Sequence, residues 1–284
     1  MNKITAIQGE DGSNSAAAAR SLLGDDVALL YCDSFQDAFN ALEDGTASRA
    51  VLPIENTTAG IIQPVWDRLL GITPGRKLAA RSEARVRIGF VAAALPGARN
   101  AVKKILAHEV ANRQCRKFLQ ESGWTVVTCH DTAGAARLVR EGNDPTVAAL
   151  CPLPAARVHK LEILNPDCGD SARTWTRFLL IEHGDAAPTP DDDRSILIFA
   201  LQDIPGALVK TLSAFSSQGL NLSAIHSRAV PGFPGQYRFF VELNVGAKDP
   251  RSIAAMGEVT RSTSELQLLG SYPTPPWPEE MPTR

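Results

Sequence analysis

The sequence predicts an α/β protein of two lobes, followed by a smaller domain with the element order βαββαβ. Short apolar, β-rich segments alternate with amphipathic segments from the N-terminus to residue 183. Such alternation is typical of a mostly parallel sheet covered by helices. A Pro- and Asp-rich stretch then precedes a second run of strands and helices, which begins at residue 195. At 284 residues the chain is long enough for more than one hydrophobic core.

The first 183 residues divide into two similar sets of elements. In the first set we expect strands at residues 3–8, 27–32 and 49–54, and helices at 13–23, 34–43 and 60–70. In the second set we expect strands at 77–82, 85–94, 104–107, 124–129, 146–150, 161–164 and 176–182, and helices at 109–121, 132–141 and 153–159. Two lobes that share crossing strands would leave a cleft at their junction, where ligands of open α/β sheets bind.

The C-terminal third has its own pattern. Residues 184–194 are a linker by composition, and the consecutive aspartates Asp191, Asp192 and Asp193 are expected to be solvated, because neighbouring carboxylates point in different directions. Residues 195–272 predict strands at 195–201, 221–228, 237–245 and 265–270, with helices at 206–218 and 250–261. This order is that of a ferredoxin-like split βαβ domain. Residues 273–284 form a Pro-rich tail.

Composition excludes several classes of function. The formal net charge of −2 gives no reason to expect nucleic-acid or membrane partners. The N-terminus lacks the apolar stretch of a signal peptide, so a cytoplasmic location is expected. The five cysteines are scattered and form no Cys-x-x-Cys pair, which predicts reduced thiols and no metal site.

Three segments carry polar side chains where strands meet helices or lobes. Residues 8–15 and 53–60 each run from a strand through a turn into a helix, where backbone N–H groups can bind an anion or be capped by a neighbouring side chain. Glu55 is either a protonated acid in the cleft or a carboxylate that caps amides, and His108 is either a titrating group or a hydrogen-bonded histidine behind the site. The third segment, residues 174–178, opens the last strand before the linker.

Taken together, these segments resemble the prephenate dehydratase family along nearly the whole chain. The matching segments are residues 9–15, Pro-Ile-Glu-Asn at 53–56 with Gly60, His108 with Gln114-Cys115-Arg116, residues 131–136, Ala148-Ala149 and Thr176-Arg177-Phe178. The Thr-Arg-Phe triplet is the catalytic signature of that family. The resemblance implies a two-lobed, periplasmic-binding-protein-like catalytic domain at residues 1–183.

The C-terminal domain resembles the ACT domain, an amino-acid-sensing module. The resemblance implies phenylalanine as the allosteric effector, a homodimer or homotetramer, and an effector site at Gly206, Ala207, Leu208, Val209, Asn221, Ser227 and Arg228. Gly206 allows close approach of a ligand, and the helix start can hold its carboxylate. The Glu-Ser-Arg-Pro motif of the family is His226-Ser227-Arg228-Ala229 here.

The reaction that the resemblance implies converts prephenate to phenylpyruvate, water and carbon dioxide, without a cofactor or metal ion. Thr176 is expected to hydrogen-bond the departing hydroxyl, since a threonine hydroxyl is too weak an acid to supply a proton outright. Arg177 is expected to bind a substrate carboxylate through two parallel hydrogen bonds, beside Phe178. The expected substrate-binding residues are Ser13, Asn14, Ser15, Glu55, Asn56, Thr57, His108 and Thr174.

Several departures from the family pattern keep other functions open. Thr174 stands where the family usually has Asn, Thr57 replaces a serine, and Ala107-His108 replaces a Ser-His pair. An arogenate dehydratase would use the same fold and chemistry on the aminated substrate. A prephenate decarboxylase is less favoured, because the triplet is intact. A non-catalytic amino-acid sensor is the alternative outside enzymes.

Overall fold

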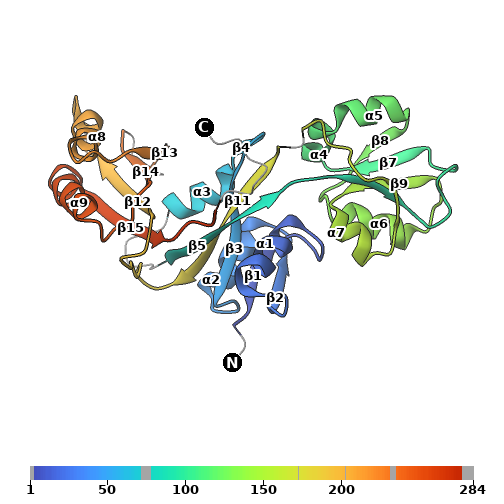
Figure 1. The fold of residues 1–284 in the computed structure, drawn as a ribbon, viewed down its shortest axis with the longest axis horizontal. Coiled ribbons are helices and arrows are strands. Elements are labelled where there is room, and N and C mark those ends of the chain that lie inside the picture. The colour runs from blue at the N-terminus through green and yellow to red at the C-terminus, as the bar shows by residue number, and fades with distance from the viewer. Residues whose placement is uncertain (1–2, 72–77, 172, 202, 231–234, 277–284) are drawn as a thin grey trace.

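Two lobes and a C-terminal domain lie in a row, with the first lobe in the middle (Figure 1). The computed structural model describes residues 3–71, 78–171, 173–201, 203–230 and 235–276. The chain leaves the first lobe after strand β5 (Leu78–Arg87) and returns in strand β11 (Trp175–His183). The predicted fold class, a two-lobed α/β unit followed by a βαββαβ domain, is confirmed.

The first lobe contains strands β1 (Thr5–Gln8), β2 (Leu29–Cys32), β3 (Arg49–Asn56), β4 (Gly60–Ile61), β5 and β11, with helices α1 (Asn14–Leu23), α2 (Phe35–Glu43) and α3 (Gln63–Leu70). Strand β1 pairs in parallel with β2 and β3. Strand β11 runs antiparallel to both β3 and β5, so the expected mostly parallel sheet is wrong for this half of the lobe. The helix expected from Gly60 begins later, because Pro64 occupies its first turn and residues 60–61 pair with β3 instead.

The second lobe contains strands β6 (Val91–Ala94), β7 (Lys104–Ala107), β8 (Thr125–Thr128), β9 (Val147–Cys151) and β10 (Glu162–Asn165), with helices α4 (Glu109–Gln114), α5 (Arg116–Ser122), α6 (Gly134–Gly142) and α7 (Leu153–Val158). Its sheet has the order β10-β6-β9-β7-β8. The helix expected at 109–121 is divided in two. The Asp170 carboxylate accepts the N–H groups of Arg116 and Lys117 at 3.0 and 3.1 Å and so caps a new helix start.

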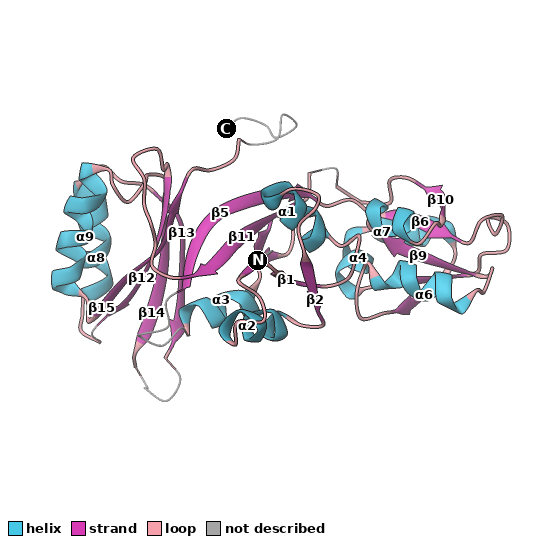
Figure 2. Cartoon of the chain, turned by 90° about the horizontal axis from the view of Figure 1, so that it is seen from below, coloured by secondary structure: helices cyan, strands magenta, loops and turns pink. Residues whose placement is uncertain are grey.

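The C-terminal domain contains strands β12 (Arg194–Leu201), β13 (Leu222–Ala229), β14 (Tyr237–Leu243) and β15 (Glu265–Tyr272), with helices α8 (Ala207–Ser217) and α9 (Pro250–Ser262). The two helices cover one face of the strands, at the end of the molecule (Figure 2). The opposite face packs on the first lobe, where the rings of Trp66 in α3 and Phe240 in β14 lie 3.8 Å apart between centroids. Residues 231–234, where the Pro/Gly-rich sequence predicts a hairpin, and residues 277–284 of the tail lie outside the described residues.

The sheets of the first lobe and of the C-terminal domain are joined into one. Strand β15 pairs in parallel with β5 at Gly270 and Ala80, which gives the order β13-β14-β12-β15-β5-β11-β3-β1-β2. One hydrophobic cluster accordingly combines Leu179 and Ile181 of β11 with Ile198 of β12 and Phe240 of β14. The C-terminal domain is therefore an extension of the sheet that carries β11.

The described helices are all too short or too polar to cross a bilayer. All five cysteines are free thiols, as predicted. In the described part of the chain, no group of three or more His, Cys, Asp or Glu side chains is arranged to hold a metal ion.

Gly270 supplies a test of the sheet junction. A Cβ at this position would lie 2.5 Å from the Ala80 carbonyl oxygen and 2.7 Å from the Ala80 Cβ. We expect Gly270→Ala to lower the free energy of unfolding by about 1–3 kcal/mol, since the two backbones must separate. The matched control is Gly257→Ala in helix α9, where a Cβ meets nothing within 4 Å, and a neutral or slightly stabilising effect is expected. Urea unfolding measures both variants, and equal stability of Gly270→Ala and wild type would contradict the close approach.

Candidate active site

Strand β11 divides its side chains between two environments. Phe178 and Leu180 pack with helix α1 on one face of the sheet, whereas Leu179 and Ile181 pack in the cluster shared with the C-terminal domain. Thr176 shares the face of Phe178, and Arg177 shares the face of Leu179, because successive strand residues point to opposite sides. The Thr-Arg-Phe triplet is therefore split between the two faces.

A cavity of about 600 Å³ lies between the two lobes on the α1 face. From the first lobe it is lined by Gln8, Ser13, Asn14, Ser15, Asp33, Ser34, Phe35, Pro53, Asn56, Ala59, Ile62, Thr176 and Phe178. From the second lobe and the crossing segment it is lined by Ile88, Phe90, His108, Glu109, Val110, Gln114, Thr128, Cys129, His130, Asp131 and Thr132. The cavity thus brings together five of the expected substrate-binding residues with Thr176 and Phe178.

The Thr176 hydroxyl is oriented by Asn56 on the neighbouring strand. Asn56 and Thr176 are register partners, and Asn56 Nδ2 donates a hydrogen bond to Thr176 Oγ1 at 2.8 Å. The other end of the amide, Oδ1, accepts the N–H groups of Thr58 and Ala59 at 2.9 and 2.8 Å, which fixes the orientation of the amide. Because Thr176 Oγ1 accepts from Asn56, its own hydrogen remains available to donate into the cavity.

Two helix starts lie at the cavity. Ser13 caps α1, its Oγ accepting the N–H of Ala16 at 3.2 Å, so the first turn with Asn14 and Ser15 faces the cavity. The first N–H groups of a helix have no intrahelical acceptor and favour a negatively charged ligand. His108 caps α4, with Nδ1 accepting the N–H of Val110 at 3.3 Å. His108 is therefore the hydrogen-bonded histidine that the sequence offered as one alternative, and it also lines the cavity.

The charge of the cavity wall comes from acidic groups. Among its described lining residues there is no Lys or Arg, whereas Asp33, Glu109 and Asp131 are present. Of these, Asp131 accepts the N–H of Gly134 at 2.8 Å. Binding of an anionic substrate group must therefore rely on backbone N–H groups, hydroxyls, amides and the imidazoles of His108 and His130.

Arg177 lies on the far face in a buried cluster of charges. Its guanidinium donates to both carboxylate oxygens of Glu242, at 2.5 and 3.1 Å, to Glu83 at 2.8 Å and to Glu55 at 3.0 Å. The side chains of Arg177, Glu242 and Glu83 are only 12%, 1% and 0% exposed. This placement corrects the expectation that Arg177 binds a substrate carboxylate.

Two further arginines complete the cluster. Arg194 donates to Glu242 at 2.8 Å, and the guanidinium of Arg85 lies 2.6 Å from Glu83. Burial opposes ionisation of Glu242, but the guanidinium groups of Arg177 and Arg194 outweigh it, so the pKa of Glu242 lies below its ordinary value. Burial alone would lower the pKa of Arg177, yet Glu242 and Glu83 raise it. Arg177 and Glu242 therefore stabilise each other's charged forms.

Three other expected substrate-binding residues are not among the described residues that line the cavity. Glu55 accepts from Arg177 at 3.0 Å, an ion pair that is neither the protonated acid in the cleft nor the amide cap that the sequence predicts. Thr57 Oγ1 accepts the N–H of Trp175 at 3.0 Å, and the hydroxyls of Thr58 and Thr174 lie 3.1 Å apart. Thr57 and Thr174 thus form hydrogen bonds that connect the loop after β3 to the start of β11, next to the pair of Asn56 and Thr176.

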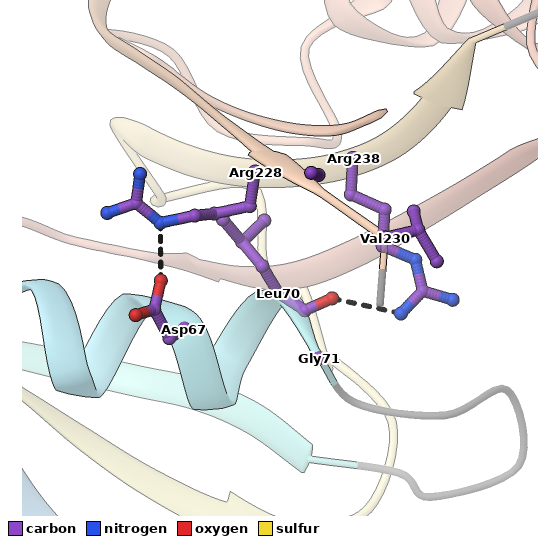
Figure 3. A pocket seen from close by; sticks show the side chains of 7 residues that line it. Asp67, Leu70, Gly71, Arg228, Val230 and Arg238 are labelled. Carbon is purple, nitrogen blue, oxygen red and sulfur yellow. Dashed lines mark hydrogen bonds and ion pairs between the residues drawn. The ribbon is translucent and has the colours of Figure 1, made fainter. Parts of the chain in front are cut away.

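The expected effector residues lie in two places. Arg228 pairs with Asp67 of α3 and lines a second cavity of about 620 Å³, together with Leu70, Gly71 and Arg238 (Figure 3). Asp67 Oδ1 and the Leu70 carbonyl oxygen accept from Arg228 and Arg238 respectively, so both guanidinium groups reach the first lobe. The other group, residues 206–209, begins helix α8 and does not line this cavity among the described residues.

Sequence reasoning missed Glu83, Glu242 and His130. Glu83 and Glu242 are the single carboxylates of strands β5 and β14, and each follows or precedes apolar or small residues with arginines on the same strand, a pattern that is compatible with a buried ion pair. His130 follows the carboxyl end of β8, where ligands of α/β sheets bind, so its position after a predicted strand was an available signal.

Comparison with known proteins agrees with this architecture. A family model described as prephenate dehydratase matches residues 5–186. Arogenate dehydratase 2 of Petunia hybrida is 32% identical over 285 residues, which cover 95% of this chain and 71% of that protein. The prephenate dehydratase of Arthrobacter aurescens, solved in complex with L-Phe, is 31% identical and superposes with a TM-score of 0.85, over 95% of this chain and 89% of that one.

A further solved structure, GqqA, is described as a novel type of quorum quenching acylase. It is 30% identical and superposes with a TM-score of 0.88, over 96% of this chain and 99% of that one. The match of the prephenate dehydratase model covers both lobes, including β11 with its Thr-Arg-Phe triplet and the paired strand β3. This chain belongs to the prephenate dehydratase family.

Proposed function

We propose that the chain converts prephenate to phenylpyruvate, with loss of water and carbon dioxide. The observation that carries this proposal is the Thr176 hydroxyl, which lines the interlobe cavity and accepts a hydrogen bond from Asn56. Its remaining hydrogen can donate to the hydroxyl that leaves the substrate ring. A donor held in place before the reaction stabilises charge on the departing oxygen without reorganising in the transition state.

The start of helix α1 is the proposed site for a substrate carboxylate. The backbone N–H groups of Asn14 and Ser15 offer fixed dipoles, and the side chain of Ser13 already caps the helix. Phe178 and Phe90 provide apolar wall on either side of the lobe junction, against which the ring can pack. Loss of carbon dioxide is favoured where water is excluded from the ring carboxylate.

Arogenate is the second candidate substrate. It differs from prephenate by an ammonium group, and a cavity wall with Asp33, Glu109 and Asp131 but no described Lys or Arg is suited to a cation. The similarity to arogenate dehydratase 2 of Petunia hybrida favours the same substrate. On arogenate, the same dehydration and decarboxylation would yield phenylalanine directly.

Acyl transfer, as suggested by the likeness to GqqA, has less support from the cavity. Such a reaction needs an activated nucleophile. The Ser13 hydroxyl accepts from the first turn of α1, and burial raises the pKa of the Cys129 thiol, which keeps it protonated. Neither side chain is prepared to attack a carbonyl group.

We further propose that the C-terminal domain is an ACT domain that binds phenylalanine between two copies of the chain. Gly206 has a φ of +82° at the start of α8, and the space over its missing Cβ is open. The adjoining Val209 is 69% exposed, as expected of a surface that a ligand or partner covers. The complex of the A. aurescens relative with L-Phe supports this effector.

Phenylpyruvate formation tests the proposed reaction. Wild type is expected to produce it from prephenate, and Thr176→Val to lower kcat by about a hundredfold or more, since valine has the same shape but no donor. Absorbance of phenylpyruvate in alkali measures both rates, and the release of phenylalanine from arogenate is measured in parallel. Thr176→Ser is the matched control, because it retains the hydroxyl.

Three outcomes count against this assignment. A Thr176→Val rate within about threefold of wild type would remove Thr176 from the chemistry, because that difference is below about 1 kcal/mol of barrier. A kcat/KM higher for arogenate than for prephenate would make the second candidate the function. Activity on neither substrate would leave a non-catalytic amino-acid sensor as the remaining interpretation.

Asn56→Asp tests the orientation of the Thr176 hydroxyl. The carboxylate cannot donate, so the threonine hydrogen would turn toward it and away from the substrate. We expect kcat to fall by about tenfold to a hundredfold, with a smaller change in KM. Steady-state kinetics on the substrate that wild type prefers provides the comparison. An unchanged kcat would show that the bond at 2.8 Å between Asn56 and Thr176 has no part in catalysis.

Gly206→Val tests the effector site. The substitution strains the backbone at φ +82° and fills the open space, so phenylalanine is expected to lose both binding and inhibition. Gly219→Ala, at the other end of α8 with a φ of +68° and equally open surroundings, carries a similar backbone cost and is expected to retain both. Calorimetry measures the binding of phenylalanine, and reaction rates at saturating phenylalanine measure its inhibition. Retained inhibition in Gly206→Val, or no heat with wild type, would refute the proposed site.

A further inference from the structure

Two members of the buried charge cluster are chain neighbours of the residues at the centre of the candidate site. Arg177 follows Thr176, and Glu55 precedes Asn56. Thr176 pairs in register with Asn56, and the next pair along the same two strands is Arg177 with Glu55. The ion pair between Arg177 and Glu55, at 3.0 Å, therefore ties the strands together one residue away from the hydrogen bond between Asn56 and Thr176. The register is irregular directly after Arg177, between Arg177 and Phe178. A bulge of this kind re-aims side chains and needs local support.

The strongest contact of this cluster comes from the C-terminal domain. Glu242 of β14 accepts two hydrogen bonds from Arg177, whereas Glu83 and Glu55 accept one each. Arg177 Nε is buried without a hydrogen-bond partner, so the position of the guanidinium depends on its two Nη groups. Two parallel bonds to one carboxylate also fix the plane of the guanidinium, which a single bond does not.

We propose that Glu242 is a positioning residue of the candidate active site, acting through Arg177 to hold Thr176 and Asn56 in register. The inference rests on the proposed function, in which the Thr176 hydroxyl donates to the leaving group. It adds that the C-terminal domain supplies a side chain on which catalytic geometry depends. A displacement of Glu242 then re-aims Thr176, although Glu242 is not itself among the described residues that line the cavity.

Two features of the cluster restrict the movement of Glu242 and Arg177. Glu242 Oε1, which accepts from Arg177, also accepts from Arg194 at 2.8 Å, and the Glu83 oxygen that Arg177 does not contact lies 2.6 Å from Arg85. The described cluster contains three arginines and three carboxylates, and of the carboxylates Glu55 is 44% exposed whereas the others are buried. Removing one partner would leave a buried charge unpaired, and the neighbouring side chains would have to move to compensate.

The test compares four full-length proteins: wild type, Glu242→Gln, Glu242→Asp and Glu265→Gln. Glutamine keeps the shape of Glu242 but loses its charge, and aspartate keeps the charge with a shorter reach. Glu265→Gln is the matched control, because Glu265 pairs with Arg238 at 3.0 Å within the same domain. We expect Glu242→Gln to lower kcat by about tenfold to a hundredfold with KM changed less than about threefold. Glu242→Asp should recover part of the loss, and Glu265→Gln should match wild type.

A purely structural role is separated by two additional readouts. On a Thr176→Val background, Glu242→Gln is expected to change the residual rate by less than about twofold, because the group it positions is gone. Hydrogen exchange should accelerate in peptides that span residues 53–58 and 174–178, while strand β9 in the second lobe keeps its protection. If Glu242→Gln does not fold, Glu242→Asp carries the same comparisons.

The outcomes separate this inference from the proposed function. Wild-type kcat in Glu242→Gln, or a full further loss on the Thr176→Val background, would overturn the positioning role. If strand β9 loses as much protection as residues 53–58 and 174–178, the positioning role is also overturned, because such a loss indicates general destabilisation. If wild type acts on neither prephenate nor arogenate, the proposed function fails, and the exchange experiment alone decides whether Glu242 holds the register.

Discussion

The alternation of side chains along strand β11 is the constraint on which the rest of the structure depends. A strand presents neighbouring residues to opposite faces, so Thr176 and Arg177 cannot serve the same cavity. Thr176 is directed to the interlobe cavity beside α1, and Arg177 to the buried carboxylates beside the C-terminal domain. In the proposed reaction, the Thr-Arg-Phe triplet thus combines the hydroxyl donor of Thr176 with Arg177 as an anchor for strand β11.

The continuous sheet connects the C-terminal domain to the strand that carries Thr176 and Arg177. Strands β5 and β15 meet at Gly270, so the C-terminal domain and the first lobe share a backbone network as well as a hydrophobic cluster. A buried ion cluster contributes little net stability, because the cost of removing charges from water offsets their attraction. The contribution proposed for it here is geometric: the contacts of Arg177 with Glu242 and Glu55 hold the strand register at Asn56 and Thr176.

Much of the fold was predictable from local patterns, because capping residues, glycines and apolar periodicity mark most element ends. Ser34 caps α2 by accepting the N–H of Asp37, at the start of the helix expected over residues 34–43. The division of the helix at Cys115 was not predictable, since the cap that starts α5 comes from Asp170, 54 residues further along. The location of Thr176 at the lobe junction followed from the sequence. Strand periodicity directs Arg177 to the face opposite Thr176, whereas its pairing with Glu242 depends on tertiary packing alone.

The kinetics of Arg177→Lys on prephenate, or on arogenate if wild type prefers it, test the central claim most directly. Lysine keeps the positive charge but lacks the planar fork, so the cluster would stay charged while the guanidinium plane is lost. If Arg177 anchors β11 from behind, kcat falls while KM stays within about threefold of wild type. A KM raised about a hundredfold with kcat near that of wild type would show that Arg177 holds the substrate, and would contradict the division of the triplet between two faces.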